Sequence, residues 1–157
     1  MFAEMNWYGV KQNDFRVVNL YSMHYSSERS SAGRTKWLRH GITGPGETMT
    51  LITSDARALF LWIKQVDRDD GQKGVNCGVF RNIGQQQSST LILEAMDLAW
   101  QRWPNERLFT YVDPGRVKSS NPGYCFKMAG WQTAGKSKRR KLHLLEVLPA
   151  AAMRKVA

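Results

Sequence analysis

Residues 75–103 have the sequence VNCGVFRNIGQQQSSTLILEAMDLAWQRW and contain the clearest structural pattern in the chain. Residue character alternates over Val75–Phe80, which predicts a β-strand. The alternation sets three residues on one face against three on the other: Val75, Cys77 and Val79 against Asn76, Gly78 and Phe80. A polar loop follows. Apolar residues then recur at helical spacing up to Pro104, which predicts an amphipathic helix over about Ser89–Trp103.

The joint between this strand and this helix has the composition of a phosphate-binding loop. Backbone amides at a helix N-terminus carry about half a positive charge and favour phosphate groups. A glycine-containing bend with serine hydroxyls can therefore wrap a pyrophosphate, helped by a cation at the strand end. The residues predicted to do so are Arg81, Gly84, Gln85, Gln86, Ser88 and Ser89. The alternative is a joint that binds nothing, with Arg81 a solvated charge.

The remainder of the chain completes an α/β fold, a mixed sheet flanked by helices. After the long helix we expect a strand at Leu108–Val112, a short helix from Asn121-Pro122 to Gly130, and paired strands at Gln132–Thr133 and Lys141–Val147. Before residue 75 we expect a strand over 16–23, a basic loop over 26–47 with a helical turn around Trp37, a strand at Met49–Thr53, and a helix from Ser54 to about Val66. The last of these segments could instead stay extended. One domain is expected over 1–149, with a frayed basic tail over 150–157.

The chain is strongly basic. Lys and Arg number 23 against 13 Asp and Glu, which gives 157 residues a formal net charge of +10. Such an excess attracts polyanions, so nucleic acid is the expected partner class, and a merely soluble basic protein is the alternative. The charge gathers in two clusters: Arg29, Arg34, Lys36, Arg39 and His40, and Lys136, Lys138, Arg139, Arg140 and Lys141. No apolar run is long enough to span a bilayer and no secretory signal is visible, so a cytoplasmic protein is expected.

The segment NPGYCFKMAGW at residues 121–131 resembles a motif of the GNAT acetyltransferases. In that family a short helix after the fifth strand has the pattern Asn…aromatic-x-x-x-Gly-aromatic, matched here by Asn121, Phe126, Gly130 and Trp131. The resemblance implies the GNAT fold and acetyl-CoA or a related acyl-CoA as cofactor, with Phe80, Asn121 and Phe126 also near it. Many members have a tyrosine that protonates the departing thiolate where this chain has Phe126. Tyr124 lies two residues earlier, about 200° around an ideal helix.

A second resemblance covers roughly residues 17–147. It rests on MHYS at 23–26, GVNCGVFRN at 74–82, QQQSS at 85–89, YVDP at 111–114 and SSNPGYCFKMAGW at 119–131, which look like the Mom family of phage DNA-modification proteins. That family is associated with converting adenine N6 to a carbamoylmethyl derivative, which protects phage DNA from restriction. The resemblance implies double-stranded DNA as partner, in the cytoplasm of a host cell. It implies catalytic positions at His24, Tyr25, Asp113 and Tyr124.

Each of these residues also has a structural interpretation. His24 and Tyr25 fit a satisfied residue after a strand and a core aromatic, and Asp113 fits a turn before Pro114-Gly115. Lys136, Lys138, Arg139 and Arg140 fit a solvated hairpin tip as well as a DNA contact. Two rival functions remain open: an N-acetyltransferase for a protein, polyamine or antibiotic amine, and a non-catalytic nucleic-acid-binding module.

Metal and thiol chemistry have little support in the sequence. The chain has three histidines without ligand spacing, so no metal site is predicted, and an accessory metal is left open. Cys77 and Cys125 form no CxxC pair and are expected to be reduced, buried thiols, with a disulfide or a redox role as the alternative. The oligomeric state is left open, with a homodimer as one option.

Overall fold

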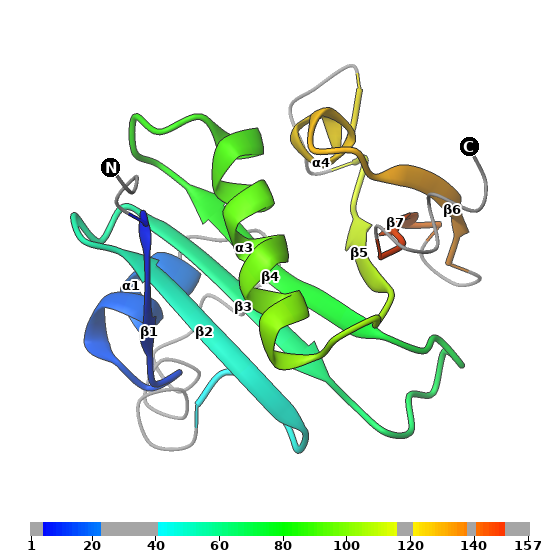
Figure 1. The fold of residues 1–157 in the computed structure, drawn as a ribbon, viewed down its shortest axis with the longest axis horizontal. Helices are drawn as coiled ribbons and strands as arrows, with labels where there is room; N and C mark the ends of the chain where they lie inside the picture. Colours follow the sequence, from blue (N-terminus) through cyan, green and yellow to red (C-terminus); the bar gives the residue numbers. More distant parts are fainter. Residues whose placement is uncertain (1–4, 23–40, 116–120, 138–140, 150–157) are drawn as a thin grey trace.

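One seven-stranded sheet organises the chain. The structure is a computed structural model that describes residues 5–22, 41–115, 121–137 and 141–149. Its elements are β1 Trp7–Val10, α1 Phe15–Ser22, β2 Glu47–Thr53, β3 Ala58–Lys64, β4 Val75–Asn82, α3 Ser88–Arg102, β5 Leu108–Val112, α4 Tyr124–Met128, β6 Gln132–Lys136 and β7 His143–Val147. The strands lie in the order β1-β2-β3-β4-β5-β7-β6 (Figure 1).

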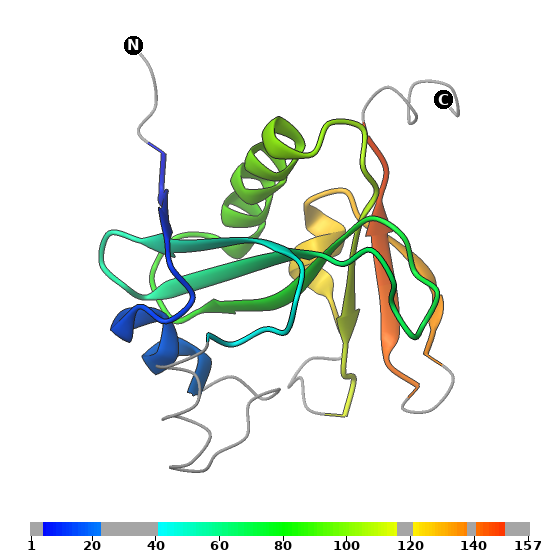
Figure 2. The same cartoon turned by 90° about the horizontal axis from the view of Figure 1, so that it is seen from below.

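The sheet is mixed, as predicted. Among the described strands, β4 and β5 form the only parallel pair, and all other neighbours are antiparallel. Helix α3 lies across one face of the sheet and α1 against the other (Figures 1 and 2). The expected α/β architecture with helices on both faces is therefore confirmed.

Strand β3 is buried on both faces, because a helix covers each. Phe60 and Trp62 belong to the cluster under α3, and Leu59 and Leu61 to the cluster under α1. We call these sides the α3 face and the α1 face. On the α3 face, Trp62 donates its Nε1 hydrogen to the Ala95 carbonyl at 3.0 Å, so the strand and the helix are also joined by a buried hydrogen bond.

The predicted helix from Ser54 to Val66 is wrong; the alternative that this segment stays extended is correct. Residues 53–58 form a tight turn, in which Ala56 has a left-handed φ of 57°. The buried Thr53 hydroxyl closes it by accepting from the Ala58 amide at 3.1 Å while donating to Asp55 at 2.7 Å. The continuous apolar run that follows fits a strand buried on both faces as well as it fits a helix, and pairing on both edges decides for the strand.

The predicted strand over 16–23 is also wrong, because residues 15–22 form α1. Val17, Val18 and Leu20 are buried, and the Asp14 carboxylate accepts from the Arg16 amide at 2.9 Å, which supports the first turn. Packing on the sheet therefore overrides the β-propensity of the two valines. Residues 23–40, with the expected helical turn around Trp37 and most of the basic loop, lie outside the described residues, as does the tail over 150–157.

The second half of the chain follows the sequence pattern more closely. The predicted strands at 49–53, 75–80 and 108–112 and the long helix are confirmed to within a few residues, as is the pairing of β6 with β7. The short helix begins later than predicted, since Gly123 rather than Asn121 is its N-cap. Gly130, with φ 95°, follows its end as predicted. Strand β1, which pairs with β2, was not predicted.

The segment between β3 and β4, residues 65–74, contacts β5 on the α1 face. Arg68 forms an ion pair with Asp70 at 2.8 Å and lies over the Phe109 ring, 5.2 Å from its centroid. The Tyr111 hydroxyl donates to Asp70 at 2.9 Å. The hydrogen bond from Arg68 is the main cause that lowers the pKa of Asp70 to about 2, from an ordinary value of 3.8.

This pKa predicts acid sensitivity at one carboxylate. A carboxyl group with a depressed folded-state pKa stabilises the fold above its unfolded pKa, and that contribution is lost as the pH falls toward about 2. We expect the difference in urea midpoint between the natural protein and Asp70→Asn to shrink between pH 5 and pH 2. Equal midpoint differences at both pH values would contradict the assignment.

Candidate cofactor and acceptor site

The pairing between strands β4 and β5 ends halfway along their length. They pair at three positions, from Val75↔Leu108 to Cys77↔Thr110, although both strands continue beyond. The Thr110 hydroxyl donates to the Cys77 carbonyl at 2.9 Å at the last pair. Beyond it the ribbons run apart toward the end of the sheet where α3 begins (Figure 1). The edge of β4 that faces β5 therefore has backbone groups that no described strand pairs with.

A bulge in β4 determines which side chains face which side. Trp62 pairs with Cys77 and Leu61 with Val79, so Gly78 is an extra residue in the strand. Cys77 packs on the α3 face, but Val79 packs on the α1 face. The simple alternation expected from the sequence, which placed both on one face, is therefore wrong. After the bulge, Phe80 returns to the α3 face.

The loop between β4 and α3 is organised by Asn82, which the sequence analysis missed. Its Nδ2 donates to the Gln86 carbonyl at 2.8 Å and to the Ser88 hydroxyl at 3.0 Å. Its Oδ1 accepts from the Gly84 amide at 3.0 Å. A Cβ at Gly84 would lie 3.1 Å from Gln86 Oε1 and 3.2 Å from the Arg57 Cβ, so the bend is tight. One side chain thus makes three of the hydrogen bonds that hold the bend in shape.

The N-terminus of α3 leaves amides available for a ligand. Gln87 is the N-cap and gives no side-chain cap, and the first turn has no acidic residue. The Leu91 amide donates to the Gln87 carbonyl at 3.1 Å, so the amides of Ser88, Ser89 and Thr90 precede the first helical hydrogen bond. They form the positive end of a 15-residue helix. Gln86 Oε1 is buried without a hydrogen-bond partner in the described part of the chain.

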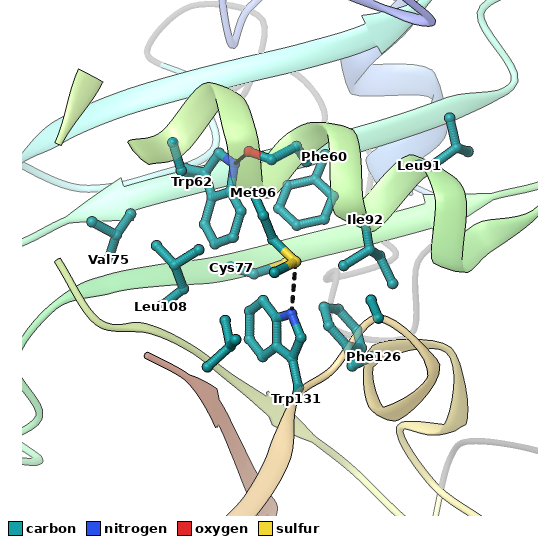
Figure 3. Packing of buried hydrophobic residues seen from close by; sticks show 14 of the residues in the cluster. Phe60, Trp62, Val75, Cys77, Leu91, Ile92, Met96, Leu108, Phe126 and Trp131 are labelled. Atoms are coloured by element: carbon teal, nitrogen blue, oxygen red, sulfur yellow. Dashed lines mark hydrogen bonds between the residues drawn. The ribbon is translucent and has the colours of Figure 1, made fainter. Parts of the chain in front are cut away.

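The aromatic residues predicted near the cofactor lie in the core. Phe126 is buried and packs edge-on against Phe80, with centroids 5.8 Å apart, and against Trp131 at 4.9 Å. Figure 3 shows Phe126 and Trp131 facing Met96 on α3, and the Trp131 Nε1 donates to the Met96 sulfur at 3.1 Å. These contacts fix α4 and the start of β6 against α3.

Other predicted residues lie on the surface of this region. Tyr124, the first residue of α4, is 55% exposed. Asn121 is exposed and accepts from the Lys127 ammonium at 2.6 Å, and Gln85 is exposed in the bend. Asp113 follows β5 and accepts from the Gly115 amide at 2.9 Å, the turn contact that its sequence context allows.

Arg81 lies on the other side of the sheet from the predicted cofactor loop. It pairs with Leu59, which belongs to the cluster under α1, whereas the next residue, Asn82, pairs with Ala58 of the α3 cluster. Residues opposite one another in an antiparallel pair share a face. Arg81 therefore lies on the α1 face, on the opposite side of the sheet from α3.

Several predicted residues fall outside the described part of the chain: His24, Tyr25, Arg29, Arg34, Lys36, Arg39, Lys138, Arg139 and Arg140. Of the predicted DNA contacts, Lys136 is described, and it is exposed at the end of β6. Among the described residues no group of three or more His, Cys, Asp or Glu could hold a metal ion. No described helix is long and apolar enough to cross a bilayer.

The two cysteines are free and poorly suited to act as nucleophiles. Cys77 is buried and Cys125 is partly buried. Burial raises the pKa of both thiols above the ordinary value, because it disfavours the thiolate. The site therefore offers no thiolate in the described residues.

Three solved structures share this architecture. A mutant spermidine N-acetyltransferase from Vibrio cholerae has a TM-score of 0.62 at 11% identity, covering 96% of this chain and 97% of that one. An aminoglycoside acetyltransferase in complex with coenzyme A has a TM-score of 0.61 at 11% identity, covering 97% and 99%. An acyl-CoA N-acyltransferase from Pseudomonas aeruginosa has a TM-score of 0.55 at 12% identity, covering 94% and 100%.

No protein-family model matches the chain, and no curated protein matches it by sequence. The likeness to solved structures covers nearly the full length of both partners in each case. It shows that the chain has the fold of the GNAT acetyltransferases, as the motif at residues 121–131 implied.

Proposed function

We propose that the protein is an acyl-CoA-dependent N-acyltransferase. The observation that carries this proposal is the uncapped N-terminus of α3, joined to a bend that Asn82 holds in shape, at the end of the sheet where β4 and β5 separate. A solved structure with this fold contains coenzyme A, and another contains CoA and spermine, which supports the same class of cofactor.

The residues present fit the diphosphate of such a cofactor. The amides of residues 85–90 would donate to the phosphate oxygens, and the positive end of α3 would favour their charge. The unpaired edge of β4 beyond Cys77 would hold the extended arm of the cofactor through backbone groups. When bound, the acyl-CoA supplies an activated acyl group.

The chain's own side chains would then handle protons and position the acceptor. Phe126 is buried and has no proton to give, whereas the exposed Tyr124 phenol is available as the acid for the leaving thiolate. Asp113 is a base for the amine, and His24 and Tyr25 complete the proposed set. Phe80, Asn121 and Phe126 would support the cofactor by shaping the wall around it.

We further propose adenine N6 in double-stranded DNA as the acceptor. The net charge of +10 supports a polyanionic partner, and the motif resemblance supports this particular base. The adenine would have to leave the duplex stack to be reached. Acyl transfer alone joins N6 to the carbonyl carbon and leaves an N-acetyl group. A carbamoylmethyl product needs a bond from N6 to the methylene carbon and an added nitrogen, so acyl transfer does not account for it.

A small-molecule amine is the second candidate acceptor. The spermidine and aminoglycoside acetyltransferases that share the fold support it directly. Both candidates use the same cofactor site, and they differ in the acceptor and in the product formed on it.

One experiment separates them. The purified protein is incubated with acetyl-CoA and with spermidine, an aminoglycoside or a peptide, and nucleosides from DNA of cells that express the protein are analysed by mass spectrometry beside an Asp113→Ala control. Altered adenine that disappears in the control supports the DNA acceptor. Acetylated amines with unaltered adenine support the second candidate, and no CoA binding at all would overturn the proposed class.

A further inference from the structure

A cationic side chain on the α1 face of β4 has a buried donor atom that no described residue accepts from. Arg81 is partly buried, and its Nε is fully shielded from solvent, yet this atom donates no hydrogen bond within the described ranges. Arg81 also takes no part in the ion pairs found there, which involve Arg16, Lys64, Arg68 and Arg107. A shielded charged donor without an acceptor is costly, because its lost hydration is not replaced.

A second polar atom without a described partner and an exposed glycine lie on the same face of β4 as Arg81. Asn76 lies on the same face, opposite Ile63, and its Oδ1 is buried without a hydrogen-bond partner in the part that the structure describes. Between Asn76 and Arg81, the bulged Gly78 is exposed although β4 is an interior strand of the sheet. A Cβ at Gly78 would approach the Ile63 Cδ1 to 2.8 Å, which places this bare position on the α1 face as well.

Two orphaned polar atoms thus flank a bare stretch of backbone on the face opposite α3. The α3 face already holds the proposed cofactor loop, so the α1 face is the side from which an acceptor can approach the separated part of β4. The guanidinium donates five hydrogens in a planar fork that matches a carboxylate or phosphate. An anion bound at Arg81 would accept a hydrogen bond from the shielded Nε. No described side chain supplies such an acceptor.

We propose that Arg81 binds an anionic group, a phosphate or a carboxylate, of the acceptor molecule. This inference rests on the proposed acyltransferase function and narrows its acceptor. It assigns Arg81 to the acceptor rather than to the cofactor. It also disfavours polycationic acceptors such as spermidine, because Arg81 and the net charge of +10 would repel them.

The Arg81 Nε–H signal in a two-dimensional ¹H–¹⁵N NMR spectrum tests the proposal directly. A shielded Nε–H exchanges slowly with water, so its signal should be observable near neutral pH. The protein is titrated separately with inorganic phosphate, acetate, deoxyadenosine 5′-monophosphate and spermidine, and Arg81→Gln identifies the signal. Arg81→Lys keeps the charge without the planar fork, and Lys11→Gln removes one exposed charge elsewhere as the matched control.

We expect at least one of the anions to shift the Arg81 signal saturably, and spermidine to leave it unchanged. Binding of that anion should weaken roughly tenfold in Arg81→Gln, less in Arg81→Lys and not in Lys11→Gln, since a hydrogen bond to a charged group contributes on that scale. Shifts with phosphate and the nucleotide but not acetate assign a phosphate, and the converse assigns a carboxylate.

An Arg81 signal that no anion moves, or that spermidine moves equally, would overturn the inference. The proposed function fails in a different way, through absent CoA binding measured by calorimetry on the natural protein. Normal CoA affinity in Arg81→Gln is expected as well. A loss of CoA affinity in this variant, with its circular dichroism unchanged, would indicate that Arg81 binds the cofactor. That result would contradict its assignment to the acceptor.

Discussion

An Asn82→Ala variant is expected to bind CoA between about tenfold and a hundredfold more weakly than the natural protein. The substitution removes three hydrogen bonds that hold the bend at the N-terminus of α3: those to the Gly84 amide, the Gln86 carbonyl and the Ser88 hydroxyl. Each such bond contributes about 0.5–1.5 kcal/mol net, and a bend that must be ordered on binding weakens affinity by a similar amount. Isothermal titration calorimetry with CoA measures the effect.

Asn82 is a positioning residue, so its test needs a readout that a general loss of order in the bend would not produce. Asn82→Asp keeps an acceptor for the Gly84 amide but places a negative charge beside the proposed diphosphate. We expect it to bind CoA more weakly than Asn82→Ala does, with a deficit that shrinks as salt rises. Asn13→Ala, in the exposed turn before α1, serves as the control and should bind normally. Full CoA affinity in both Asn82 variants would refute the role.

A Trp131→Ala variant is expected to lose about 3–5 kcal/mol of unfolding free energy, the usual cost of deleting a large buried aromatic. Trp131 is 3% exposed, stacks on Trp62 at 6.2 Å and meets Phe126 edge-on. It also donates its indole hydrogen to Met96. Such a loss is a large share of the stability of a typical domain, so urea denaturation should show an early midpoint or no folded baseline.

Two further variants make this result interpretable. Trp131→Phe keeps most of the apolar volume and loses the indole donor, so its midpoint should lie between those of the natural protein and Trp131→Ala. Leu93→Ala removes a side chain that is 47% exposed on α3 and should change the unfolding free energy by less than about 1 kcal/mol. A Trp131→Ala midpoint equal to that of Leu93→Ala would show that α4 and β6 are not anchored through this ring.

The sequence predicts an element correctly where either the helical or the strand period of apolar residues dominates. The prediction is wrong where both periods fit equally well. The amphipathic helix at 88–102 and the strand at 108–112 have unambiguous patterns and are correct. The run ALFLWIK of β3 is apolar throughout, so its period cannot be measured, and burial between two helices decides its state. The valines of α1 favour a strand locally, but the chain packs them on the sheet as a helix.

The site was predicted in outline because its cofactor side depends on local sequence. A strand, a glycine-containing bend and a helix with serines at its start follow one another directly in the chain. Asn82 could have been found, since Asn at i with Gly at i+2 is typical of a side-chain-closed turn. The bulge at Gly78 could not, because a one-residue register shift depends on pairing with β3. That shift separates Arg81 from the loop that follows it.

The account depends most on where the diphosphate of CoA binds, and a crystal structure of the protein with CoA measures this directly. We predict that the phosphate oxygens lie within hydrogen-bonding distance of backbone amides between Gln85 and Thr90, on the α3 side of β4, with Arg81 on the opposite face and free of the cofactor. A diphosphate held by Arg81 on the α1 face, or CoA bound away from the N-terminus of α3, would contradict the account.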